Sequence, residues 1–188
     1  MGFLRRITAD GTVPVTFCRM LPYAGTPIEE GLAQEGRLRG RVENPDYDFL
    51  DPRIHSYFEA LNRLVAHWTN GSDALLNQLN FAWHEYGVLR NLFPPLADLP
   101  SYERCLRTIT RRSNEYLLTL VEDVANAFEN DCWRVPSAVE VQAASQRFGA
   151  QLLAERNAFV LQNQETLLAC LGAASRAQGV AAASHLEA

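Results

Sequence analysis

The chain has 188 residues, and its 17 basic and 22 acidic side chains give a formal net charge of −5. This balance, with 47% hydrophobic residues, is typical of an ordinary globular protein. No run of about 18 apolar residues occurs, and no apolar h-region follows Arg5 and Arg6. We therefore expect a cytoplasmic protein, without a membrane span or secretory signal, that binds neither membranes nor nucleic acids.

Residues 13–21 carry the one strong strand signal of the sequence. They are β-branched and aromatic at the centre and apolar on both faces, which predicts a buried strand. A strand needs neighbours for its backbone N–H and C=O groups, and the rest of the sequence supplies none. Three solutions stay open: the strand pairs with another molecule, it pairs with its twin in a homodimer, or the segment packs irregularly on the helices.

A turn and a short helix follow the predicted strand. Thr26 can cap the helix, Pro27 suits its first position, and Glu29 completes a capping box. We expect this helix to end near Gly36. Residues 36–50 contain glycine, proline and charges without a helical period, so they are predicted to form a loop across the surface.

Helical periodicity dominates the remainder of the chain. The predicted helices span about 51–70, 72–92, 100–130 and 137–171, with Pro94–Pro95 as a stop and Ser137–Glu140 as a capping box. Arg111 to Asn114 interrupt the apolar face of the third helix, which predicts that they face a cavity or mark a kink. Trp68 and Trp83 lie in the apolar stripes and are expected in the core.

These elements predict a mainly α fold. An antiparallel helical bundle is preceded by one β-strand and a βα turn. We divide the chain into residues 1–50 with the strand, loop and short helix, a four-helix region at 51–171, and a disordered tail at 172–188.

Three short motifs resemble one protein family. They are VTFCRMLPYAGTPIE at residues 15–29, EGRLRG at 35–40 and PDYDFLDPR at 45–53. Their order and spacing resemble the C-terminal region of cobalamin-dependent (B12-binding) radical SAM proteins, where the last barrel strand leads into a P-Y-x-G-T-P loop and a helical tail. The resemblance implies that residues 1–50 are the last unit of a partial (β/α) barrel. The chain lacks the cluster-binding C-x3-C-x2-C run and the Asp-x-His cobalamin signature, and thus the barrel core.

The resemblance also implies a function. The chain would be a C-terminal fragment or subunit that closes the barrel and shapes substrate access without being catalytic alone. The 4Fe-4S cluster, S-adenosylmethionine and cobalamin would be held by the missing part, and no cofactor by this chain. Tyr23, Gly25, Thr26 and Pro27 would lie at the mouth of the active site, since loops after barrel strands form that mouth. The partner would be a radical SAM barrel, in the same enzyme or as a separate chain.

Plainer interpretations stay open beside this one. The turn at 22–27 can be a tight turn with a good helix cap. The chain can be a stand-alone helical interaction module, a homodimer through residues 13–21, or the product of a truncated gene without activity.

No catalytic or metal-ligating residue is assigned from the sequence. The three histidines within the predicted helices lack the spacing of metal ligands on one helix face. The aspartates at 46, 48 and 51 lack the glycine and glutamate of a calcium loop, and Asp51 is better used as a helix cap. The four cysteines contain no C-x2-C pair and are expected to be free thiols. The side chains excluded as ligands on these grounds are His55, His67, His84, Asp46, Asp48, Cys18, Cys105, Cys132 and Cys170.

Overall fold

The computed structural model describes residues 1–71, 73–93, 96–130 and 135–186, with side chains through residue 176. Within these residues the chain is mainly helical, as predicted, and has one small antiparallel sheet. The helices are α1 (Gly2–Ile7), α2 (Pro27–Gln34), α3 (Pro52–Thr69), α4 (Leu75–Leu92), α5 (Leu99–Glu129), α6 (Ala138–Gln162) and α7 (Gln164–Leu186), and the strands are β1 (Leu38–Arg41) and β2 (Asn44–Tyr47).

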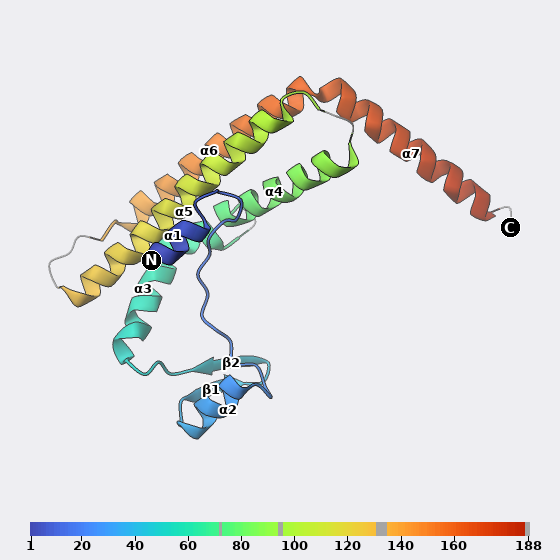
Figure 1. The fold of residues 1–188 in the computed structure, drawn as a ribbon. Helices are drawn as coiled ribbons and strands as arrows, with labels where there is room; N and C mark the ends of the chain where they lie inside the picture. The colour runs from blue at the N-terminus through green and yellow to red at the C-terminus, as the bar shows by residue number, and fades with distance from the viewer. Residues whose placement is uncertain (72, 94–95, 131–134, 187–188) are drawn as a thin grey trace.

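The bundle consists of α3, α4, α5 and α6, every pair of which is in contact. α3 and α4 follow one another along α5: Tyr57 in α3 donates to the Val121 carbonyl, whereas Tyr86 in α4 donates to Glu103 near the start of α5. α6 returns antiparallel to α5 (Figure 1). The four predicted helices therefore form three antiparallel rods, one of which is divided between α3 and α4.

Aromatic stacking fills the space between the rods. The Trp68 ring stacks on Tyr116 with centroids 5.2 Å apart, and Tyr102 stacks on Phe159 at 4.7 Å. Trp68 is 1% exposed, which confirms it as a core residue. Trp83 is half-buried and packs at the edge of the same cluster.

Local capping signals explain where several helices begin and end. Asp51 accepts the Arg53 N–H at the start of α3, and Ser137 and Glu140 form the predicted capping box of α6. The predicted start at Ser72 and the Pro94–Pro95 stop lie outside the described residues. Instead of one helix over 137–171, α6 ends at Asn163, because this buried side chain donates to the Ala97 and Phe159 carbonyls. α7 then includes 172–186, within the segment expected as a disordered tail.

The prediction of a strand at residues 13–21 is wrong for this chain. None of these residues is in a strand or a helix, and the segment runs as irregular extended backbone from the bundle to the hairpin and α2 (Figure 1). The physical reason is that no parallel neighbour strand is present among the described residues to complete a ladder. Of the three solutions that the sequence left open, the structure adopts irregular packing on the helices.

The two strands lie instead in the predicted loop at 36–50. β1 and β2 form a hairpin in which Leu38 pairs with Tyr47 and Arg41 with Asn44. Gly40 has a φ of +78°, and a Cβ there would lie 2.2 Å from the Asn44 carbonyl oxygen, so the hairpin requires glycine. Together with α2 the hairpin forms an arm (residues 22–50) that projects from the bundle (Figure 1).

Candidate interaction site on the extended segment

The extended segment has strand-like alternation although it is not paired. Val15, Phe17 and Arg19 are half-buried, whereas Thr16, Cys18 and Met20 between them are exposed. Phe17 packs against the hydrophobic core of the bundle. One face of the segment is therefore covered by the protein's own side chains and the other face is free, as in a strand at the surface of a sheet.

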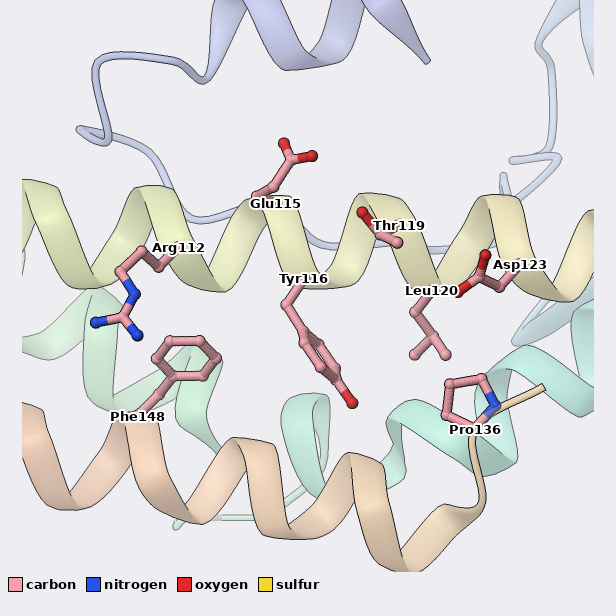
Figure 2. Close-up of a pocket in the computed structure, with 8 residues that line it drawn as sticks. All are labelled: Arg112, Glu115, Tyr116, Thr119, Leu120, Asp123, Pro136 and Phe148. Carbon is pink, nitrogen blue, oxygen red and sulfur yellow. The ribbon is translucent and has the colours of Figure 1, made fainter. Parts of the chain in front are cut away.

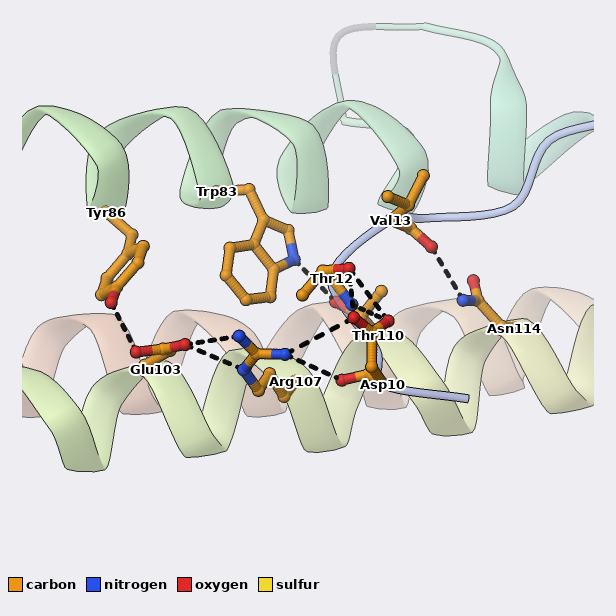
Figure 3. A network of polar contacts seen from close by, with 9 residues as sticks. All are labelled: Asp10, Thr12, Val13, Trp83, Tyr86, Glu103, Arg107, Thr110 and Asn114. Atoms are coloured by element: carbon orange, nitrogen blue, oxygen red, sulfur yellow. Dashed lines mark hydrogen bonds and ion pairs between the residues drawn. The ribbon is translucent and has the colours of Figure 1, made fainter. Parts of the chain in front are cut away.

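Asn114 of α5 binds the start of this segment. Its Nδ2 donates to the Val13 carbonyl at 2.9 Å, and its Oδ1 accepts the Val15 N–H at 2.8 Å. Asn114 is 2% exposed, so its amide is fixed beneath the segment (Figure 3). The sequence had indicated this position only as a polar interruption of an apolar helix face.

Thr110, just before the interruption at Arg111 to Asn114, and the neighbours of Asn114 within it make other contacts. Thr110 is fully buried and accepts the Trp83 indole N–H at 3.0 Å, and Ser113 is also buried. Arg112 is exposed and lines a groove. α5 continues through all of these residues, so the interruption marks buried polar contacts and a groove rather than a kink.

Arg19 ties the other end of the segment to the arm. Its guanidinium lies 4.4 Å from the Tyr47 ring centroid and 4.5 Å from that of Phe49, and it forms an ion pair with Asp46 at 2.8 Å. Cation–π contacts with two rings hold the guanidinium more firmly than an exposed ion pair alone. No sequence pattern indicates this contact, because its members are separated along the chain and belong to an unpredicted hairpin.

Backbone groups between these two anchors lack partners. No hydrogen bond from or to the backbone of residues 16–20 is present among the described residues, whereas Val15 is bonded to Asn114. Unpaired N–H and C=O groups in extended backbone are a template for pairing with another strand. The segment thus has the hydrogen-bonding character of an edge strand.

The chain before this segment is strapped onto α5 by polar contacts. Arg5 in α1 bonds Glu115 at 2.9 Å and Glu122 at 2.7 Å, and these bonds hold the pKa of Glu122 below its usual value, with the Arg5 contact as the main cause. Arg107 donates to the Asp10 carbonyl at 3.3 Å and forms an ion pair with Glu103 (Figure 3). We call residues 1–12, which these contacts hold on α5, the strap. The strap and Asn114 together fix where the extended segment begins.

The turn at the end of the segment contains the residues that the sequence placed at an active-site mouth. Thr26 caps α2 by accepting the Glu29 N–H at 3.3 Å, and its hydroxyl donates to the Tyr23 carbonyl at 2.7 Å. The Gly25 N–H donates to the Glu29 carboxylate at 3.1 Å. Pro27 occupies the first helical position. The structure therefore brings all four residues together as a capped turn, with the Tyr23 side chain 63% exposed.

The remaining polar candidates are accounted for by local contacts. Arg37 pairs with Glu35 and Arg39 with Asp48, as expected for charged surface residues. His55 lies 3.3 Å from Glu59 on the surface of α3. No group of three or more potential metal ligands occurs in the described parts of the chain.

A groove of about 340 Å³ lies between α5 and α6 (Figure 2). Tyr116, Leu120 and Phe148 form its apolar wall, and the Arg112 guanidinium lies 5.8 Å from the Phe148 ring centroid. A second, more polar cavity of about 370 Å³ includes His67 and lies between the end of α3, the start of α4 and residues 142–153 of α6. Neither contains, among its described lining residues, a set of side chains arranged for catalysis.

Comparison with known proteins adds no relative. No family model, no curated protein and no solved structure matches this chain. None of the helices in the described part of the chain combines the length and the apolar character that crossing a membrane requires. The resemblance to cobalamin-dependent radical SAM proteins therefore stays a prediction.

Proposed function

We propose that this chain is a docking element that adds its extended segment as a strand to the sheet of a partner protein. Because its motifs resemble the C-terminal region of cobalamin-dependent radical SAM proteins, the partner would be the barrel of such an enzyme, which would carry the cluster, S-adenosylmethionine and cobalamin. In that assembly the chain shapes access to the active site and is not catalytic alone. The unpaired backbone of Thr16, Cys18 and Met20 carries this proposal.

The arm supports a docking role because it has almost no core of its own. Within the arm, residues 22–50, all of which the structure describes, Pro22 and Leu32 are the two buried residues. The large apolar side chains exposed on the segment, the arm and the start of α3 are Val13, Met20, Leu21, Tyr23, Ile28, Val42, Leu50 and Ile54. A docked sheet would remove these exposed apolar side chains from water, which favours association.

Position along the chain supports the role proposed for the capped turn. Tyr23, Gly25, Thr26 and Pro27 directly follow the segment, so in a parallel sheet they would lie at the carboxyl edge of the added strand. Loops at this edge form the active-site face of (β/α) barrels. The exposed Tyr23 ring is then the side chain best placed to meet substrate.

The experiment mixes the purified chain with a cobalamin-dependent radical SAM protein truncated before its last strand and measures complex formation by sedimentation. We expect a complex that Met20→Asp weakens at least about tenfold, a change of 1.4 kcal/mol. Leu161→Asp, at a 73% exposed apolar position on α6, is the matched control and should bind like the original chain. Absence of a complex, or equal loss with both variants, would refute the proposal.

A homodimer is the competing outcome of the same experiment. If the chain alone sediments as a dimer that Met20→Asp dissociates, its partner strand comes from a second copy. The docking edge would then be correct and the barrel assignment wrong.

A further inference from the structure

The two edges of the extended segment are not equivalent. In extended backbone the N–H and C=O groups of successive residues point to opposite edges, so alternate residues share an edge. The first edge begins with Val13 and Val15, both bonded to Asn114, and continues with Phe17 and Arg19, whose backbone groups have no hydrogen-bond partner among the described residues. The second contains Thr16, Cys18 and Met20, without hydrogen-bond partners among the described residues.

Asn114 copies the hydrogen bonds of a neighbouring parallel strand. In a parallel ladder, one residue donates to the carbonyl of residue i−1 and accepts the N–H of residue i+1 on the facing strand. The Asn114 amide makes this pair of bonds to Val13 and Val15, on either side of Pro14, at 2.9 and 2.8 Å. A side chain on a helix thus occupies the place of one residue of a missing strand.

The Asn114 amide is fixed in this place because it is buried and makes both hydrogen bonds. Asn114 is 2% exposed, and its neighbours Leu117 and Leu118 on α5 are each 1% exposed. Moving the amide aside would leave the buried donor and acceptor of Asn114 itself unpaired, which is costly. A partner strand therefore cannot take this edge at Val13 and Val15 without disrupting α5.

We propose that Asn114 is a positioning residue that makes the segment a one-sided strand. Asn114 blocks the start of the first edge, so the partner sheet joins along the edge of Thr16, Cys18 and Met20, which is open at all three residues, and the segment becomes the terminal strand of the combined sheet. The partner must then offer one unpaired strand edge, and the complex contains one copy of each chain. This inference rests on the proposed function for the nature of the partner, and on Asn114 for the choice of edge.

Proline substitutions test the choice of edge, because proline removes one backbone N–H and is compatible with extended backbone. Cys18→Pro removes a donor of the open edge, and Cys18→Ala is its matched control. Val15→Pro removes the donor that Asn114 already satisfies, and Val15→Thr is its control. With the truncated barrel as the probe, Cys18→Pro should weaken the complex at least about tenfold, whereas Val15→Pro should weaken it no more than about threefold. Equal loss at Cys18 and Val15 would overturn the one-sided strand while leaving the docking function intact.

Hydrogen exchange of the free chain tests the role of Asn114 without any partner. The Val15 amide should exchange more slowly than those of Thr16, Cys18 and Met20, and Asn114→Leu should abolish the difference. A Val15 amide that exchanges as fast as its neighbours in the unchanged chain would overturn the inference, whether or not the barrel binds.

Discussion

Replacing Asn114 with leucine removes the contact that holds the extended segment against α5. The amide makes two hydrogen bonds, to Val13 and Val15, and each contributes about 1 kcal/mol. Leucine has a similar volume, so no cavity adds to the loss. Val15 is half-buried, so water can reach its freed N–H and the penalty for an unpaired donor is small. We expect the free energy of unfolding to fall by about 2 kcal/mol.

The assay is urea unfolding followed by tryptophan fluorescence, with thermal unfolding as a second measurement. For a chain of 188 residues, a loss of about 2 kcal/mol lowers the melting temperature by about 4 to 8 °C. Asn126→Leu, about three turns further along α5, is the control and should change stability by less than about 0.5 kcal/mol. If both leucine variants are as stable as the original chain, the two hydrogen bonds do not hold the segment.

Three further predictions concern the strap and the core. Gly11→Ala should destabilise the chain more than Gly25→Ala. Both glycines have positive φ, but a Cβ at Gly11 would lie 2.1 Å from the Arg107 carbonyl oxygen, whereas nothing lies within 4 Å of a Cβ at Gly25. Equal melting temperatures of the two variants would contradict the close approach of Gly11 to α5. Acid should loosen the contacts of residues 1–12 with α5, because hydrogen bonds from Thr12 and Arg5 lower the pKa of Asp10 and of Glu122, respectively. The stabilisation from these two carboxylates is present above their unfolded pKa values of 3.8 and 4.5 and is lost as the pH falls below them. In Arg5→Gln, the protection of the amides of residues 1–12 against hydrogen exchange should therefore fall less steeply with acid. Burial raises the pKa of Tyr102 to about 12, and its hydroxyl is buried without a partner among the described residues. Tyr102→Phe should therefore leave the free energy of unfolding unchanged or raise it by up to about 1 kcal/mol. A clear fall in this free energy, measured by urea unfolding, would show that the hydroxyl makes a hydrogen bond.

Helix boundaries were predictable where the signal is local. Asp51 before Pro52, and Ser137 with Glu140, satisfy the first N–H groups of their own helices, so a few adjacent residues decide the outcome. The break at Asn163 was not predictable in the same way, because its amide bonds the Ala97 carbonyl, 66 positions away in the sequence.

The extended segment shows the limit of predicting strands from composition. Its β-branched and aromatic residues correctly indicated extended backbone, but its partner is an asparagine 99 positions later, on a helix. The hairpin was missed because its strands have four residues each and carry charges, glycine and proline rather than alternating apolar residues. The Arg19 contact with Tyr47 and Phe49 depends on that hairpin and was missed with it.

The most direct test of the docking function is hydrogen exchange across residues 13–21, in the free chain and in the presence of the truncated radical SAM barrel. The amides of Thr16, Cys18 and Met20 should exchange at the rates of unstructured backbone in the free chain and become protected when the barrel is added. Protection in the free monomer would show that the edge is already satisfied within the chain. Unchanged fast exchange with the barrel in excess would show that this segment does not form a strand with it.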